Sequence, residues 1–178
     1  MRLFVALPLP EPWRSPLLVA QFLLPVPRRE PPENMHLTLC FLGEVADRQL
    51  DDLHDGLSVI TGPRPMLRGA GLDLFGGARA HNLHLRIAPD PGLERLAARI
   101  ARAARTAGLT IEARRFAPHV TLARFRPEAV DQARLSAAIV TAPPLDLPPV
   151  EVAAFTLFRS ILRPDGARYH ALAEYPLA

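Results

Sequence analysis

The chain has 178 residues and a mass of 19.6 kDa, which corresponds to a single domain. Hydrophobic residues make up 49% and charged residues 22%, ordinary globular values that exclude a disordered or fibrous chain. The net charge of +3 rests on 21 arginines, because the sequence contains no lysine. Guanidinium groups suit phosphate recognition, although a coding bias would produce the same composition.

The cysteine content and the apolar runs bear on the cellular compartment in which the protein works. The single cysteine, Cys40, cannot form an internal disulfide, so we expect a small core residue. The first apolar run, residues 3–7, is too short for a signal peptide. No apolar run reaches the roughly 20 residues that span a bilayer, since Gln21 and Pro25 interrupt the longest one. We therefore expect a soluble cytoplasmic monomer that does not bind membranes.

Apolar periodicity and turn residues predict mixed strands and helices. In chain order we expect a strand at 3–7, a helix at 13–24, a strand at 36–42, a helix at 47–60, strands at 67–75 and 80–88, a helix at 90–108, a strand at 119–125, a helix at 127–140, and strands at 150–158 and 168–175. A turn at 164–166 joins the last two strands. In the clearest helix Asp90 is the expected N-cap and Gly108 the stop.

Two segments share the pattern His-x-Thr-Leu, one at residues 36–39 and one at 119–122. Each lies in a predicted strand that a turn and a helix follow, and each half of the chain contains one copy. The repeat indicates an internal duplication. On a strand, residues i and i+2 point to the same face, so each imidazole stands beside its own threonine hydroxyl. If a pseudo-twofold axis relates the halves, both His-Thr pairs can meet across one cleft.

Two imidazoles and two hydroxyls fit a phosphate better than a metal ion. The sequence has no His-Glu-x-x-His, and threonine is a poor zinc ligand, so we expect no metal and no cofactor. Near neutral pH one imidazole can be neutral while the other is protonated, which provides a base and an acid together. A base and an acid of this kind can catalyse an in-line displacement at phosphorus. A strained 2′,3′-cyclic phosphate is a suitable substrate, because opening the ring relieves strain.

The chain resembles the two-histidine phosphoesterases, and within them the bacterial and archaeal RNA 2′,3′-cyclic phosphodiesterases, also called 2′-5′ RNA ligases. The likeness covers almost the whole chain and rests on the segments at residues 2–7, 34–45 and 116–124, and on the closing segments at 155–158 and 168–169. It implies an α+β fold in which a bilobal, pseudo-twofold duplication forms two antiparallel sheets. These sheets would enclose a concave central cleft, with helices packed outside, as one two-lobed domain over residues 1–178.

The resemblance also implies a reaction and a role for each site residue. The reaction is hydrolysis of a terminal 2′,3′-cyclic phosphate on RNA to a 2′-phosphate, with 2′-5′ ligation as the reverse reaction. His36 would be the general acid and His119 the general base. The phosphate would bind to Thr38, Thr121 and Arg124, and Phe4 would either stack on a base or belong to the core. The expected partners are RNA ends, such as those of tRNA, or small cyclic nucleotides.

Two alternatives remain open at this stage. One is a phosphodiesterase for a small cyclic or 2′-5′-linked nucleotide. The other is an RNA-binding module that keeps the cleft without catalysis, although a module of that kind would have no need of both histidines and both threonines. The sequence assigns no role to His84, Arg86, Tyr169 or His170.

Overall fold

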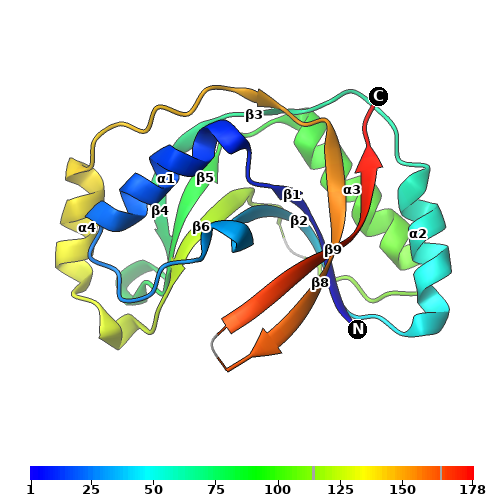
Figure 1. Cartoon of the computed structure of the whole chain (residues 1–178), viewed down its shortest axis with the longest axis horizontal. Coiled ribbons are helices and arrows are strands. Elements are labelled where there is room, and N and C mark those ends of the chain that lie inside the picture. The colour runs from blue at the N-terminus through cyan, green and yellow to red at the C-terminus, as the bar shows by residue number, and fades with distance from the viewer. Residues whose placement is uncertain (114, 165) are drawn as a thin grey trace.

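The computed structural model describes residues 1–113, 115–164 and 166–178, and its described residues form an α+β fold (Figure 1). The helices are α1 (Glu11–Leu23), α2 (Leu50–Ser58), α3 (Pro91–Thr106) and α4 (Gln132–Thr141). The strands are β1 (Arg2–Pro8), β2 (His36–Glu44), β3 (Met66–Leu67), β4 (Gly69–Phe75), β5 (Asn82–Ile87), β6 (His119–Arg124), β7 (Val150–Glu151), β8 (Ala154–Arg163) and β9 (Gly166–Pro176). Short 3-10 turns occupy Pro32–Asn34, Asp47–Gln49, Gly77–Arg79 and Pro127–Ala129.

Antiparallel pairing joins the long strands in the order β4-β5-β6-β2-β1-β8-β9, and β3 pairs with β7 in a separate small sheet. The α+β class and the antiparallel sheets are therefore confirmed. The structure differs from two separate sheets at one place, because β2 and β6 are linked through the single register pair Leu37 and Val120. These are the middle residues of the two His-x-Thr motifs. The two halves thus meet where the repeated motifs lie side by side.

The duplication extends to the helices. The units β1-α1-β2 and β5-α3-β6 have the same order, and β8 pairs with β1 as β4 pairs with β5. The helices cross to the opposite half, since α3 packs on β2 whereas α1 contacts β6. Figure 1 shows this exchange, with α1 and α4 beside β4, β5 and β6, and α2 and α3 beyond β8 and β9. The helices cover the sheet from outside, and the motif strands lie between them.

Helix α3 shows how the local sequence forms these elements. Its N-cap Asp90 accepts a hydrogen bond from the Leu93 amide at 2.8 Å, as the sequence predicts. Its buried residues are Leu93, Leu96, Ala97, Ile100 and Ala104. They recur every three to four positions, so one face of the helix joins the core. Cys40 is a buried free thiol, as expected.

Several boundaries differ from the predictions. The expected strand at 150–158 divides into β7 and β8, because β7 leaves the main sheet to pair with β3. The final hairpin is longer than expected, with β8 reaching Arg163 and β9 starting at Gly166. The predicted turn at 164–166 includes Asp165, which lies outside the described residues. Among the described residues, no helix is both long and apolar enough to cross a bilayer.

Candidate active site

A small cleft lies where β2 and β6 meet. The structure brings five of the predicted site residues together around it, namely His36, Thr38, His119, Thr121 and Arg124. Its remaining lining residues are Glu30, Asn34, Phe41 and Tyr169. The two repeated motifs therefore face one small volume, as the duplication predicts.

A β-bulge in each motif strand shapes this cleft. In the β1–β2 pair the register passes from Ala6 opposite Thr38 to Val5 opposite Cys40, so Leu39 is the extra residue. The β5–β6 pair repeats this shift, and there Leu122 is the extra residue. A bulge reverses the alternation of faces, so the residue five positions after each histidine joins the cleft. These residues are Phe41 in the first half and Arg124 in the second.

The two histidines are held in the same way. His36 Nδ1 lies 2.6 Å from the carbonyl oxygen of Asn34, and His119 Nδ1 lies 2.7 Å from that of Ala117. A carbonyl oxygen can only accept, so each Nδ1 carries a hydrogen and donates it. In the neutral rings Nε2 therefore has the free lone pair. Each half supplies one imidazole whose Nε2 can take up or release a proton.

Desolvation makes both rings weaker bases than free histidine. Burial, together with the charges of Arg124 and His119, lowers the pKa of His36 to about 4, although the bond to the Asn34 carbonyl acts in the opposite direction. Burial also lowers the pKa of His119, and the charge of Arg124 acts in the same direction. Without an anion, both rings are therefore neutral at pH 7. From the sequence alone, one ring can be neutral while the other is protonated near neutral pH, because the sequence shows neither the burial nor the nearby guanidinium.

Polar groups surround the Thr121 hydroxyl of the second half. The Thr121 hydroxyl oxygen accepts from Asn82 Nδ2 at 3.3 Å and from an Arg124 nitrogen at 3.4 Å. The guanidinium also lies 3.9 Å from the carboxylate of Glu30, whose side chain is 16% exposed. An anion in the cleft would meet a cation and a hydroxyl donor on this side.

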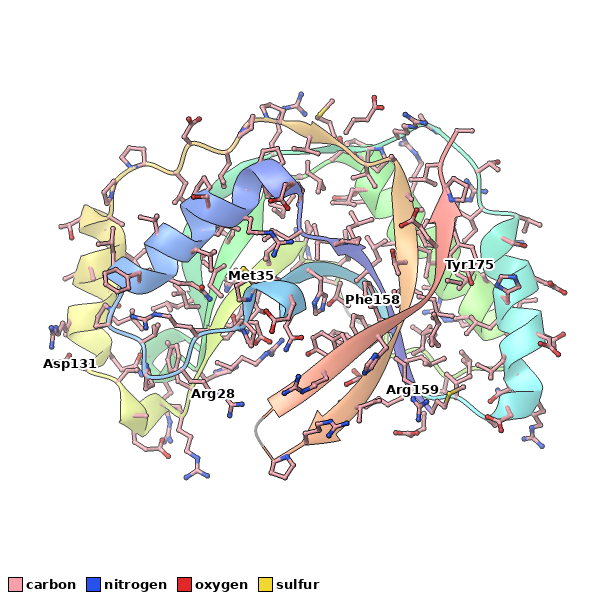
Figure 2. All side chains as sticks on the ribbon, in the orientation of Figure 1. Arg28, Met35, Asp131, Phe158, Arg159 and Tyr175 are labelled. Atoms are coloured by element: carbon pink, nitrogen blue, oxygen red, sulfur yellow. The ribbon has the colours of Figure 1, made fainter. Side chains whose placement is uncertain are left out.

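Aromatic rings surround the histidine of the first half. The Phe4 ring lies 4.8 Å from that of His36 and stacks on that of Phe158 at 5.2 Å. Figure 2 labels Phe158 on β8, near the centre of the molecule. Tyr169 meets His36 edge-on at 5.1 Å. Phe4 is 3% exposed and does not line the cleft, so it supports the His36 ring and offers no free face to a base. Phe41, at 63% exposed, has such a face.

A buried glutamine fixes the loop that carries Glu30. Gln21, on α1, is 2% exposed and donates to the carbonyl oxygens of Glu30 at 2.9 Å and Leu122 at 2.6 Å. The Glu30 amide also donates to the oxygen of Leu122 at 2.8 Å. Because Leu122 is the bulge residue of β6, these bonds hold the loop against the second motif. They keep Glu30 close to Arg124.

Comparison with known proteins identifies the family. The family model described as "LigT like Phosphoesterase" matches residues 18–83 and 85–169. The chain belongs to this family. The RNA 2′,3′-cyclic phosphodiesterase of Thermus thermophilus is 34% identical over 201 residues, which cover 99% of this chain and 90% of that protein. The protein of the same name in Bacillus subtilis is 31% identical over 127 residues, covering 68% of this chain and 69% of its own.

Solved structures of LigT have the same fold. The apo form of the Escherichia coli protein superimposes with a TM-score of 0.82 at 29% identity, covering 99% of this chain and 97% of its own. Its complex with 3′-AMP gives a TM-score of 0.80 at 28% identity, with the same coverage. The chain therefore has the α+β fold of these LigT structures.

Four residues that line the LigT-like cleft have no role predicted from the sequence, namely Glu30, Asn34, Phe41 and Tyr169. One signal was available for Phe41, because the offset of 83 positions between His36 and His119 also relates Phe41 to Arg124. Glu30 lies in a loop, Asn34 ends the 3-10 turn Pro32–Asn34 and Tyr169 lies on β9, so all three are outside the two His-x-Thr-Leu motifs.

Three unassigned residues now have positions. His84 is 2% exposed, stacks on Phe75 at 3.8 Å and lies 5.2 Å from the ring of His119. Arg86 is exposed and donates to the carbonyl oxygen of Ala70 at 2.9 Å. His170 is exposed on β9, outside the cleft lining. Within the described ranges, no three His, Cys, Asp or Glu side chains cluster closely enough to hold a metal ion.

Proposed function

We propose that this LigT-like phosphoesterase hydrolyses the terminal 2′,3′-cyclic phosphate of RNA to a 2′-phosphate, with His36 and His119 as its acid and base and without a metal ion. The observation that supports this proposal best is that both imidazoles line the same cleft. Each of them donates its Nδ1 hydrogen to a backbone carbonyl oxygen. The relatives from Thermus thermophilus and Bacillus subtilis carry the name of this activity. The LigT complexes with phosphate and 3′-AMP agree with a nucleotide phosphate as ligand.

The reaction is a displacement at phosphorus. The Nε2 atom of His119 takes a proton from water as the water oxygen bonds to phosphorus. The bond from phosphorus to O3′ breaks, and the protonated Nε2 of His36 gives its proton to O3′. The product has a 3′-hydroxyl and a 2′-phosphate. Thr38, Thr121 and Arg124 bind the non-bridging oxygens, where charge shifts during the reaction.

The difference between the halves supports this division of roles. The leaving O3′ belongs to the nucleoside, so the acid must be the histidine on the nucleoside side of the phosphate. The first half offers the exposed ring of Phe41 and the edge of Tyr169 to a sugar or base, next to His36. The second half offers Arg124 and Thr121 to the phosphate oxygens. In this proposal Phe41, and not the buried Phe4, contacts the base.

Substrate binding causes the acid to take up its proton from solution. Both rings are neutral near pH 7 without an anion, because burial lowers both pKa values. A bound phosphodiester brings one negative charge, which raises the pKa of both rings and stabilises a single imidazolium. The pair then shares one proton, which His36 uses as acid while His119 stays neutral as base. A 5′-hydroxyl in place of water would give a 2′-5′ linkage through the same displacement.

Product analysis on defined substrates tests this function. The protein is incubated with EDTA and a short RNA that ends in a 2′,3′-cyclic phosphate, and phosphorus NMR identifies the product. We expect a 2′-phosphate and unchanged turnover at rising EDTA concentration. A 3′-phosphate, or inhibition that added metal reverses, would refute the proposal. Turnover of cyclic mononucleotides alone would indicate the small-nucleotide enzyme, and RNA binding without product would indicate the binding module.

A further inference from the structure

Asn82, the first residue of β5, is a buried amide whose side chain makes one hydrogen bond within the described part of the chain. It is 4% exposed, and its Nδ2 donates to Thr121 Oγ1 on the neighbouring strand β6 (Figure 1). Its Oδ1 has no hydrogen-bond partner among the described residues. A buried polar atom without a partner destabilises the fold, so an apolar residue would suit the position better for stability alone.

The duplication shows that the fold does not require an amide here. Asn82 pairs with Arg124 in β6 as Phe4 pairs with Phe41 in β2. The same backbone position therefore holds an apolar ring in the first half and an amide in the second. The two side chains also have different neighbours. The ring of Phe4 packs on His36, whereas the amide of Asn82 contacts Thr121.

The hydrogen bonds of Thr121 determine what its hydroxyl can do. A threonine hydroxyl has one hydrogen to donate and two lone pairs that accept. Asn82 and Arg124 both donate to this oxygen, at 3.3 Å and 3.4 Å, and so occupy its accepting positions. The hydroxyl hydrogen remains for a third partner. Since Thr121 lines the cleft, this hydrogen is available to a ligand that binds there.

We infer that Asn82 is a positioning residue that fixes the Thr121 hydroxyl as a hydrogen-bond donor to the bound phosphate. The inference rests on the proposed function for its effect on turnover, but its effect on anion binding is independent of any reaction. Without the Asn82 amide, the Thr121 hydroxyl can rotate and turn a lone pair toward the phosphate. The negative charge of the phosphate repels this lone pair, so binding weakens. Asn82 itself touches neither the phosphate nor the reacting atoms.

A double-mutant cycle with Thr121 tests the inference. Asn82→Leu keeps the approximate size of the side chain and removes the donor, and Asn82→Asp keeps its shape and can only accept when ionised. We expect Asn82→Leu to lower kcat/KM for the cyclic-phosphate RNA about tenfold, and Asn82→Asp to lower it further. In a Thr121→Val background, Asn82→Leu should change kcat/KM less than twofold, because the hydroxyl it orients is gone.

Sulfate affinity, measured by calorimetry at pH 6 on the wild type, Asn82→Leu, Asn82→Asp, Thr121→Val and the Asn82→Leu/Thr121→Val double variant, separates this inference from the proposed function. We expect Asn82→Leu and Thr121→Val each to weaken sulfate binding and their effects not to add. If the wild type binds sulfate but turns over no substrate, the proposed function fails while the cycle still tests Asn82. Gln132→Leu, which removes an amide bonded to Ala80 and Pro127 outside the cleft lining, is the control.

Two results would overturn the inference. One is sulfate affinity in Asn82→Leu and Asn82→Asp equal to that of the wild type. The other is an effect of Asn82→Leu that is undiminished in the Thr121→Val background. A purely structural role would lower the thermal midpoint of Asn82→Leu, whereas we expect this midpoint to be unchanged or higher, since the substitution removes an unpaired buried oxygen.

Discussion

Anion binding in the cleft should be coupled to uptake of a proton. Burial lowers the pKa of His36 to about 4 and lowers that of His119 as well, so the anion meets two neutral imidazoles at pH 7. A bound anion favours the imidazolium form, and the protein takes a proton from solution as the anion binds. The affinity must then fall as the pH rises.

The size of this effect follows from the pKa of His36. A group with a pKa of about 4 is protonated in roughly 1% of molecules at pH 6, so protonating it there costs about 3 kcal/mol. A charge pair about 4 Å apart near a protein surface contributes about 4 kcal/mol, equal to roughly three pKa units. The bound anion would thus bring the pKa of His36 to about 7. Between pH 5.5 and 6.5, affinity should fall about tenfold.

Sulfate is a suitable probe because its charge is constant over this pH range. Its dissociation constant is measured by calorimetry from pH 5.5 to 7 in the wild type, in His36→Gln, in His119→Gln and in the double variant. We expect a shallower pH dependence in each single variant and none in the double variant. His170→Gln, which changes an exposed histidine outside the cleft, is the control. A wild-type dissociation constant that stays within twofold over this range would refute the reasoning.

Three further predictions follow from the same geometry. Arg124→Gln removes a charge that lowers the pKa of both His36 and His119, so both limbs of the pH profile of kcat/KM should move to higher pH; unchanged limbs would contradict this. Burial also lowers the pKa of His84 to about 4. The unfolded chain therefore binds more protons than the folded one between about pH 6.5 and pH 4, and folding stability should fall as the pH falls through this window, by up to about 3 kcal/mol from this residue. Urea unfolding at several pH values should show a smaller loss in His84→Leu, and an equal loss would exclude His84 as the source. Gln21→Ala leaves the carbonyl oxygens of Glu30 and Leu122 without its amide, which should cost about 1–3 kcal/mol in urea unfolding, and an unchanged midpoint would show that these bonds are dispensable.

The repeated motif explains why so much of the site is predictable. His36 and Thr38, like His119 and Thr121, are related by strand alternation within a motif and by duplication between motifs. Both relations are visible in the sequence, and the cleft unites all four residues. The capped helix α3 is predictable for a similar reason, because Asp90 and the apolar spacing are local signals.

The bulges explain much of what sequence patterns do not show. Strict alternation places Arg124 on the opposite face from His119 and Thr121, and only the extra residue Leu122 brings it to the cleft. The sequence reaches Arg124 through the family resemblance, not through periodicity. Phe41 occupies the equivalent position after Leu39, but the bulge there has no distinct residue signature.

Long-range contacts account for the remaining differences. Glu30 lies near Arg124 because Gln21, from another element, bonds to the loop and the bulge. Asn82 contacts Thr121 across a strand pair whose register no local pattern reveals. Likewise, the lowered pKa of His36 depends on burial and on the charge of Arg124, which exist only in the folded chain.

The central claim is that two histidines, one from each half, perform the chemistry together. Its most direct test is the initial rate on RNA ending in a 2′,3′-cyclic phosphate, with EDTA, for the wild type, His36→Ala, His119→Ala and the double variant, and with His170→Ala as control. We expect each single variant to lose at least about a hundredfold in kcat and the double variant to lose little more, because the two groups act in one step. A rate within tenfold of wild type in either single variant would contradict the account.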